Sequence, residues 1–270
     1  MSSQWADKPY ALISTDPFSK DSSHAAYYVA TQMALAHNGI LRGLNSIYLQ
    51  ATHIPPGDLD AIRDFLTYCQ CWCESMHHHH DAEEKIFFPS IERISEVPGL
   101  MERNIEQHRA FTPGFDLFQE YSQTCLPKDY NGRELRGLIE DFAEPLTRHL
   151  HDEIDTLRAL DKYDTKAIRQ AYQRLEKSLM DTDNVRDPLA VSERGNVTDC
   201  FQYRIGPLVF GTADRSFEGG MHDFPSVPFF VPYIIHYWFA RRYRGVWRFN
   251  PCTMWRDPRE LAFTAVSTTT

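Results

Sequence analysis

Two His-x-x-x-Glu pairs lie in separate helical stretches of this 270-residue chain, and no other feature constrains its fold as strongly. The pairs are His79 with Glu83, and His149 with Glu153. Residues four apart lie on the same face of a helix, so each pair directs an imidazole and a carboxylate toward one point. The chain must therefore fold so that two helices present metal-binding side chains to a shared interior.

Two further long helical stretches each contain a lone histidine, His37 and His108. Four helices that offer His and Glu to a common interior have the ligand types of a two-metal carboxylate centre. Neutral imidazole binds iron, zinc or copper, and a carboxylate can bridge two hard cations. The sequence therefore predicts an all-α fold, an antiparallel up-down four-helix bundle with a metal site between its helices.

Proline, glycine and helix-capping residues divide the chain into segments. Apolar periodicity predicts the bundle helices over residues 22–49, 58–87, 100–126 and 134–160, followed by a fifth helix over 166–180. After about residue 185, proline, glycine and aromatic residues become dense, which predicts a mixed extension with a short strand over 201–210 and a short helix over 233–241. We therefore expect an N-terminal arm (1–20), the bundle (21–162), and an additional helix with a C-terminal extension packed on the bundle (163–270).

The composition excludes several classes of protein. A net charge of −9 argues against a nucleic-acid surface, which needs a basic stripe. No run reaches the roughly 18 apolar residues of a membrane span, and the chain begins with no apolar signal segment, so a cytoplasmic protein is expected. The cysteines match no common zinc motif, and we expect reduced, mostly buried thiols; they are Cys69, Cys71, Cys73, Cys125, Cys200 and Cys252.

An aromatic segment over residues 227–239 is followed by Arg241, Arg242 and Arg244. An apolar face with a basic edge is typical of peptides that lie on a membrane surface. We expect this segment to pack on the domain instead, with peripheral membrane contact as the alternative.

The run His77–His80 leaves the first pair with two registers, His79 with Glu83 or His80 with Glu84. The two registers point about 100° apart on a helix, so we expect only one to face the interior. Trp72 and Met76 share an apolar stripe with His79, which favours the first register without excluding the second.

These motifs resemble the hemerythrin-like family, also called the HHE cation-binding domain. The resemblance covers residues 22–162 and rests on four segments: His37 to Leu44, His79 to Pro89, Glu106 to Arg109, and His149 to Glu153. It favours the His79/Glu83 register, because family members place a similar Glu-Glu-x-x-Phe-Phe-Pro ending after this ligand pair. The extension after residue 185 is similar to that of fungal members, and we expect it to roof one end of the bundle and form an apolar pocket.

The resemblance implies a non-haem centre of two iron ions, for which manganese is an alternative. The implied ligands are His37, His79, Glu83, His108, His149 and Glu153, with Glu83 and Glu153 as bridging candidates. Oxygen-carrying members have a second histidine where this chain has Asn104, and an Asp five residues past their last histidine, where this chain has Glu153 at four.

Fewer histidines favour oxygen activation over reversible oxygen carriage, because iron with a harder ligand set is more electron-rich. We therefore expect an oxidase or oxygenase that uses molecular oxygen on an apolar or aromatic small molecule, in the setting of secondary metabolism. The alternative is a non-enzymatic module that binds, senses or stores oxygen, nitric oxide or iron.

Overall fold

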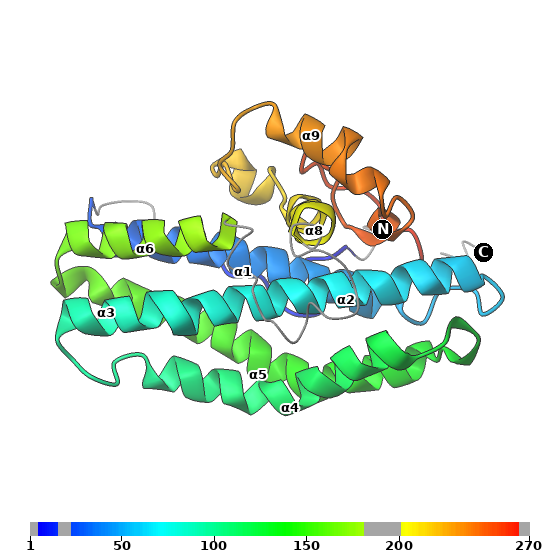
Figure 1. Cartoon of the computed structure of the whole chain (residues 1–270), viewed down its shortest axis with the longest axis horizontal. Helices are drawn as coiled ribbons and strands as arrows, with labels where there is room; N and C mark the ends of the chain where they lie inside the picture. The colour runs from blue at the N-terminus through cyan, green and yellow to red at the C-terminus, as the bar shows by residue number, and fades with distance from the viewer. Residues whose placement is uncertain (1–4, 16–22, 181–200, 265–270) are drawn as a thin grey trace.

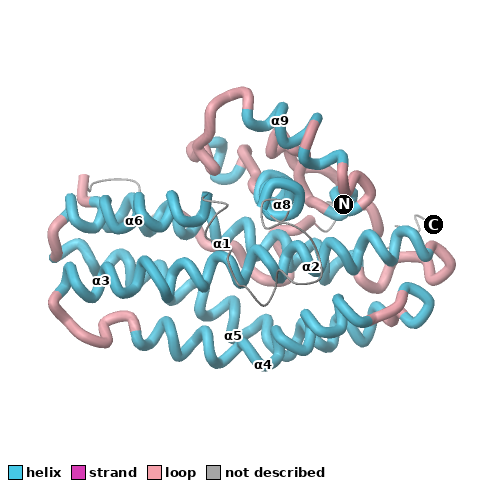
Figure 2. Tube along the Cα trace, in the orientation of Figure 1, coloured by secondary structure: helices cyan, strands magenta, loops and turns pink. Residues whose placement is uncertain are grey.

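The computed structural model describes residues 5–15, 23–180 and 201–264, and every regular element within these ranges is helical (Figures 1 and 2). An isolated bridge between Cys252 and Pro258 is the one strand-like pairing in the described part. The four long helices of the bundle are α1 (Ala25–Gln50), α2 (Leu59–Ala82), α4 (Glu102–Thr124) and α5 (Gly132–Arg158). The prediction of an all-α bundle is confirmed.

Each bundle helix packs against two others, in the cyclic order α1, α5, α4 and α2. A π-helix (Glu83–Phe87) joins α2 to α3 (Phe88–Ser95), so that α2 and α3 form one long rod in Figure 1. The fifth helix, α6 (Thr165–Met180), packs against α1 and α2 on the outside of the bundle. The short 3-10 helices Pro127–Asp129 and Ala159–Lys162 flank α5.

Local signals in the sequence set where these helices begin and end. The Asp58 carboxylate accepts from the backbone N–H of Ala61 at 2.9 Å and caps α2, as predicted. Asn131 caps α5 in the same way. The cap of α1 is His24, whose ring nitrogen accepts from Ala26 N–H, whereas the predicted start at Ser22 lies outside the described residues.

Aromatic packing fills the bundle between α2, α4 and α5. The Trp72 ring lies 5.9 Å from Phe118 and 6.1 Å from Phe142, measured between centroids. Its indole N–H donates to the carbonyl of Ile40 on α1 at 3.0 Å, so the one polar atom of this side chain is satisfied. This cluster fixes the spacing of the helices that carry the histidines.

A substitution at the start of α5 is expected to weaken the bundle. A Cβ on Gly132 would lie 2.0 Å from the carbonyl oxygen of Ala51, so the two backbones must separate. We expect Gly132→Ala to lower the free energy of unfolding by about 1–3 kcal/mol, measured by urea denaturation. Gly137→Ala in the same helix is the matched control, because its Cβ would meet nothing within 4 Å and alanine favours a helix. Equal stability of the two variants would contradict this packing.

The N-terminal segment 5–15 lies along α1. The Asn38 side chain accepts from Ile13 N–H at 2.7 Å and donates to the Ile13 carbonyl at 2.9 Å. Asn45 makes the same pair of bonds to Tyr10, at 2.9 and 2.8 Å. The buried amides of Asn38 and Asn45 thus fix this turn-rich segment to α1.

The described C-terminal segment is helical, so the strand predicted over residues 201–210 is wrong. It contains a π-helix (Phe201–Ile205), α8 (Gly206–Thr212) and α9 (Val231–Tyr237), with 3-10 turns at Phe217–Gly220, Phe239–Arg241 and Val246–Phe249. Pro207 lies in the first turn of α8, where its fixed φ starts a helix instead of continuing a strand. The short helix predicted over 233–241 is confirmed by α9 and the turn after it.

Phe249 fixes this segment to the bundle. Its ring centroid lies 5.0 Å from that of Phe65. Its carbonyl accepts from Ser46 Oγ at 2.5 Å and from Gln50 Nε2 at 3.0 Å, both on α1. The two ends of the described chain also meet, since the Trp5 indole N–H donates to a carbonyl oxygen of residue 259 at 3.0 Å.

No helix in the described ranges is both long and apolar enough to cross a membrane. The five described cysteines are all free thiols, and four of them are buried, in agreement with the sequence-based expectation. Cys200 lies outside the described residues.

Candidate metal centre

The four long helices bring all six predicted ligands together in the core. All six are buried, and four of them are fully buried. They are His37 on α1, His79 at the end of α2, Glu83 at the start of the π-helix, His108 on α4, and His149 with Glu153 on α5.

Glu83 belongs to two groups of potential metal ligands. The first contains His37, His79 and Glu83, and the second contains His80, Glu83, His108 and His149; within each group the ligand atoms lie within 4.8 Å of one another. Glu83 Oε1 is 3.0 Å from His79 Nε2, and its Oε2 is 3.7 Å from His108 Nε2. Its two oxygens therefore face different groups, which is the placement that a bridging carboxylate needs.

Glu153 lies outside both compact groups but beside each of them. Its Oε2 is 3.5 Å from His37 Nε2, in the first group, and 3.7 Å from His149 Nε2, in the second. The second predicted bridging carboxylate thus spans the same two groups from the opposite helix.

The two carboxylates lack hydrogen-bond donors. All four oxygens of Glu83 and Glu153 are buried, and none has a hydrogen-bond partner. Burial raises the pKa of both groups well above the usual range, and the Glu83 carboxylate raises that of Glu153 further. Burying two carboxylates without donors is costly unless cations compensate them. This arrangement fits two bound metal ions.

The surrounding imidazoles are neutral. Burial lowers the pKa of His37 and His149 well below the usual range, and that of His79 to about 4. The Nε2 atoms of His37 and His79 are 3.2 Å apart, and those of His108 and His149 are 2.9 Å apart. Two imidazole nitrogens at right angles about 2.1 Å from one ion would be about 3.0 Å apart, so both spacings suit a shared ion.

Hydrogen bonds from outside the cluster orient two of the rings. The Nδ1–H of His37 donates to the carbonyl of Leu150 at 2.8 Å. The Nδ1–H of His108 donates to the Glu84 carboxylate at 2.6 Å. In both rings Nε2 is the atom left facing the cluster, and such outer partners are typical of metal-binding histidines.

His80 corrects the expectation that only one register faces the interior. Its ring centroid is 4.3 Å from that of His108 and 5.4 Å from that of His149, and its Nε2 is buried without a partner. His79 faces one group and His80 the other. A centre with two groups of ligands occupies a wide arc of α2, so residues about 100° apart can both reach it.

Asn104 lies one helical turn before His108 and is buried. Neither its amide nitrogen nor its amide oxygen has a hydrogen-bond partner. One histidine beyond the six predicted residues, His80 from α2, lies in the cluster. The four-histidine run was the signal for His80 in the sequence, and His77 and His78 point elsewhere, toward Gln119 and the carbonyl of Leu179.

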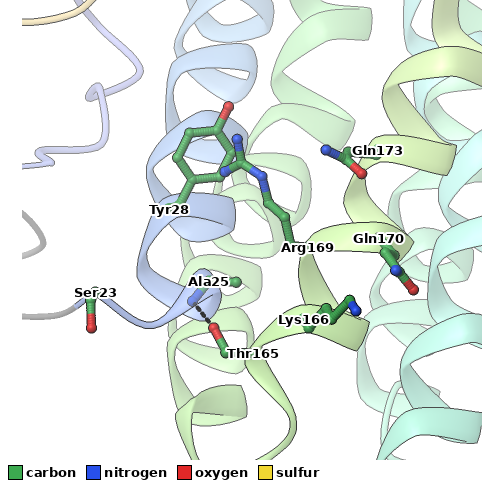
Figure 3. Close-up of a pocket in the computed structure, with 8 residues that line it drawn as sticks. All are labelled: Ser23, Ala25, Tyr28, Thr165, Lys166, Arg169, Gln170 and Gln173. Carbon is green, nitrogen blue, oxygen red and sulfur yellow. Dashed lines mark hydrogen bonds between the residues drawn. The ribbon is translucent and has the colours of Figure 1, made fainter.

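An open pocket of about 580 Å³ lies between α1 and α6, away from the cluster (Figure 3). The Arg169 guanidinium stacks 3.4 Å above the Tyr28 ring, and Thr165 accepts from Ala25 N–H at 2.8 Å. No predicted ligand and no residue of the C-terminal segment lines it. The apolar pocket expected beneath that segment stays a prediction.

Comparison with known proteins agrees with this geometry. Residues 29–160 match the model of the hemerythrin HHE cation binding domain. The chain is 37% identical, over 262 residues, to the dimeric xanthone biosynthesis cluster protein R11 of Cryptosporiopsis sp. (strain 8999). That alignment covers 96% of this chain and 93% of its relative. No solved structure matches the chain.

The matched segment contains α2, α4, α5 and all but the first four residues of α1, and the alignment with the curated relative includes the C-terminal segment as well. The chain therefore belongs to the hemerythrin HHE cation-binding family.

Proposed function

We propose that this protein is a non-haem di-iron oxidoreductase that uses molecular oxygen to oxidise an apolar or aromatic small molecule in fungal secondary metabolism. The observation that carries the proposal is the pair of buried carboxylates, Glu83 and Glu153, which lack hydrogen-bond donors and lie between two groups of histidines. The relative named for a xanthone biosynthesis cluster supports the substrate class, because xanthones are aromatic polycycles.

The proposed ligand set is the six predicted residues together with His80. His37 and His79 would hold one ion, and His80, His108 and His149 the other, with both carboxylates between them. Iron and manganese both accept imidazole and carboxylate, and iron is the family's typical metal. Bound iron would supply redox chemistry with molecular oxygen.

The chain itself supplies charge, orientation and exclusion of water. Glu83 and Glu153 would each give a bound cation a negative carboxylate, and no hydrogen bond competes for their oxygens. Leu150 and Glu84 hold the rings of His37 and His108 with Nε2 toward the centre. Burial of the six predicted ligands would keep bulk water away from bound metals.

The second candidate is reversible binding of oxygen without turnover, and His80 is the observation that favours it. The sequence argument for an oxidase relied on a reduced number of histidines. With His80 the cluster contains five histidines, so the argument from a reduced number of histidines is weaker. Measuring whether oxygen is consumed in turnover or bound reversibly distinguishes the oxidase from the oxygen-binding protein.

The test measures metal content and then oxygen uptake by the reduced, iron-loaded protein. We expect about two iron ions per chain and, with a reductant and candidate polycyclic phenols present, consumption of many oxygen molecules per chain. A variant that lacks Glu153 (Glu153→Gln) is the control for iron in solution. Uptake that stops at one oxygen per centre and reverses under vacuum would support the second candidate. A protein that takes up no metal would contradict both.

A further inference from the structure

An aromatic stripe on the C-terminal segment faces solvent. Residues 230, 233, 234, 237 and 238 follow the i, i+3, i+4, i+7, i+8 spacing of one helical face. These side chains are large and apolar, and together with Phe229 they are between 39% and 85% exposed. They are Phe229, Phe230, Tyr233, Ile234, Tyr237 and Trp238. Every strongly exposed aromatic residue in the described ranges belongs to this stripe.

The opposite face of α9 is already buried. Pro232 and Ile235 are buried, and Ile235 belongs to the main apolar core. The sequence-based expectation that this segment packs on the domain therefore holds for one face only. A helix that is apolar all round normally has both faces covered. The stripe is thus an exposed apolar patch, and patches of this kind mark binding sites.

The charge around the stripe indicates what covers it. No Asp or Glu occurs between Asp223 and Asp257, whereas five arginines do, in a chain whose net charge is −9. Arg248 pairs with Asp64, and Arg256 pairs with Asp223. Arg241, Arg242 and Arg244 are exposed directly after the stripe, and the Arg242 guanidinium also lies over the rings of Tyr203 and Tyr243. The surface is therefore basic as well as aromatic, within an otherwise acidic protein.

We propose that the stripe docks on an anionic lipid bilayer, with its aromatic side chains at the level of the lipid headgroups. Tyr and Trp concentrate at that depth because their rings are apolar and their tips polar. Exposed arginines add attraction to anionic headgroups within a Debye length. In Figure 1, α9 lies on the outer side of the C-terminal segment, away from α4 and α5, so a bilayer can approach it without meeting the bundle.

A second copy of the chain fits this surface less well. A two-fold contact places the same patch against itself, which brings the two arginine clusters together. A seven-residue helix is only about 10 Å long, whereas a stable interface needs about 800 Å² from each partner. An anionic lipid surface attracts the arginines and does not require a protein interface of that area.

The experiment is co-sedimentation of the full-length protein with vesicles. We expect binding to vesicles that contain phosphatidylserine, little binding to pure phosphatidylcholine, and release as salt is raised. Two variants test the two components separately: Phe229→Ser with Trp238→Ser, and Arg241→Glu with Arg244→Glu. Each is expected to bind at least about 10-fold more weakly.

The control is Leu117→Ser with Leu126→Ser, which removes two apolar side chains that are more than half exposed elsewhere on the surface. This control should bind like the unmodified protein. All the changed side chains are exposed, and circular dichroism checks that each variant is folded. Failure of the unmodified protein to bind anionic vesicles at low salt would overturn the proposal. So would a dimer, seen by light scattering, that the Phe229 and Trp238 changes dissociate.

Discussion

Glu83→Gln is expected to remove both metal ions from the protein while leaving the metal-free fold nearly unchanged. Glu83 is the residue shared by the two ligand groups, and its two oxygens face different histidines. Glutamine keeps the size of the side chain but lacks the negative charge and the second coordinating oxygen. Loss of residues outside the ligand set typically costs 10–100-fold in metal affinity, so this change should cost more than about 100-fold, or about 2.7 kcal/mol.

The metal-free protein provides the discriminating measurement. Burial raises the pKa of Glu83 well above its usual range, which in the absence of metal favours the uncharged carboxyl, and the glutamine amide is likewise uncharged. We therefore expect the free energies of unfolding of the two metal-free proteins to agree within about 1 kcal/mol. Iron per chain, measured by elemental analysis, should fall from about two to near zero. Glu144→Gln on the exposed side of α5 is the control and should retain both ions.

Glu84→Gln should give an intermediate result. Glu84 orients His108 through a hydrogen bond to Nδ1 and is partly exposed, so we expect a 10–100-fold loss of affinity. If Glu83→Gln instead lost stability without losing metal, the carboxylate would be structural and the proposed centre wrong.

His80→Gln is expected to lower the iron content from about two ions to about one. His80 faces only the group that contains His108 and His149, whereas His37 and His79 lie in the other. The optical spectrum of the iron-loaded protein should change with the loss of one ion. The matched control is His77→Gln, an exposed neighbour whose ring contacts Gln119.

A rescue variant separates ligation from packing. Asn104 lies one turn from His108, buried and without hydrogen-bond partners, at the position of a ligand in the oxygen carriers. We expect Asn104→His in the His80→Gln background to restore the second ion. Two irons in the single His80→Gln variant would show that His80 only fills space. One iron in both the single and the double variant would show that α4 cannot replace the ligand from α2.

Most of the fold could be predicted because the bundle's determinants are local. Capping residues such as Asp58, breaks such as Pro98 with Gly99, and apolar periodicity all act within a few residues along the chain. The six predicted site residues meet because, in an antiparallel bundle, residues at similar distances from a turn lie at the same level along neighbouring helices. Their role as metal ligands stays a prediction.

Two features could not be predicted because they depend on tertiary structure. A helical wheel assigns one narrow face to the interior, so it allowed only one of His79 and His80 there and favoured His79, whereas the two-group cluster contains both. In the C-terminal segment, apolar residues surround α9 on every side. A pattern of that kind cannot show which face meets the protein; the sequence predicted that the segment packs on the domain, and the structure shows that one face of α9 stays exposed.

The contact between Trp5 and the carbonyl of residue 259 determines when during synthesis the N-terminal segment can complete its packing. Residues 5–15 lie along α1, yet Trp5 is hydrogen-bonded at residue 259, and Ser46 and Gln50 are satisfied by the carbonyl of Phe249. During synthesis these partners emerge from the ribosome roughly 200 residues after α1 does. Helix α1 can therefore complete these contacts only after Phe249 has been synthesised. Until then, the Gln50 amide and the Phe65 ring lack the contacts that Phe249 makes with them in the folded protein.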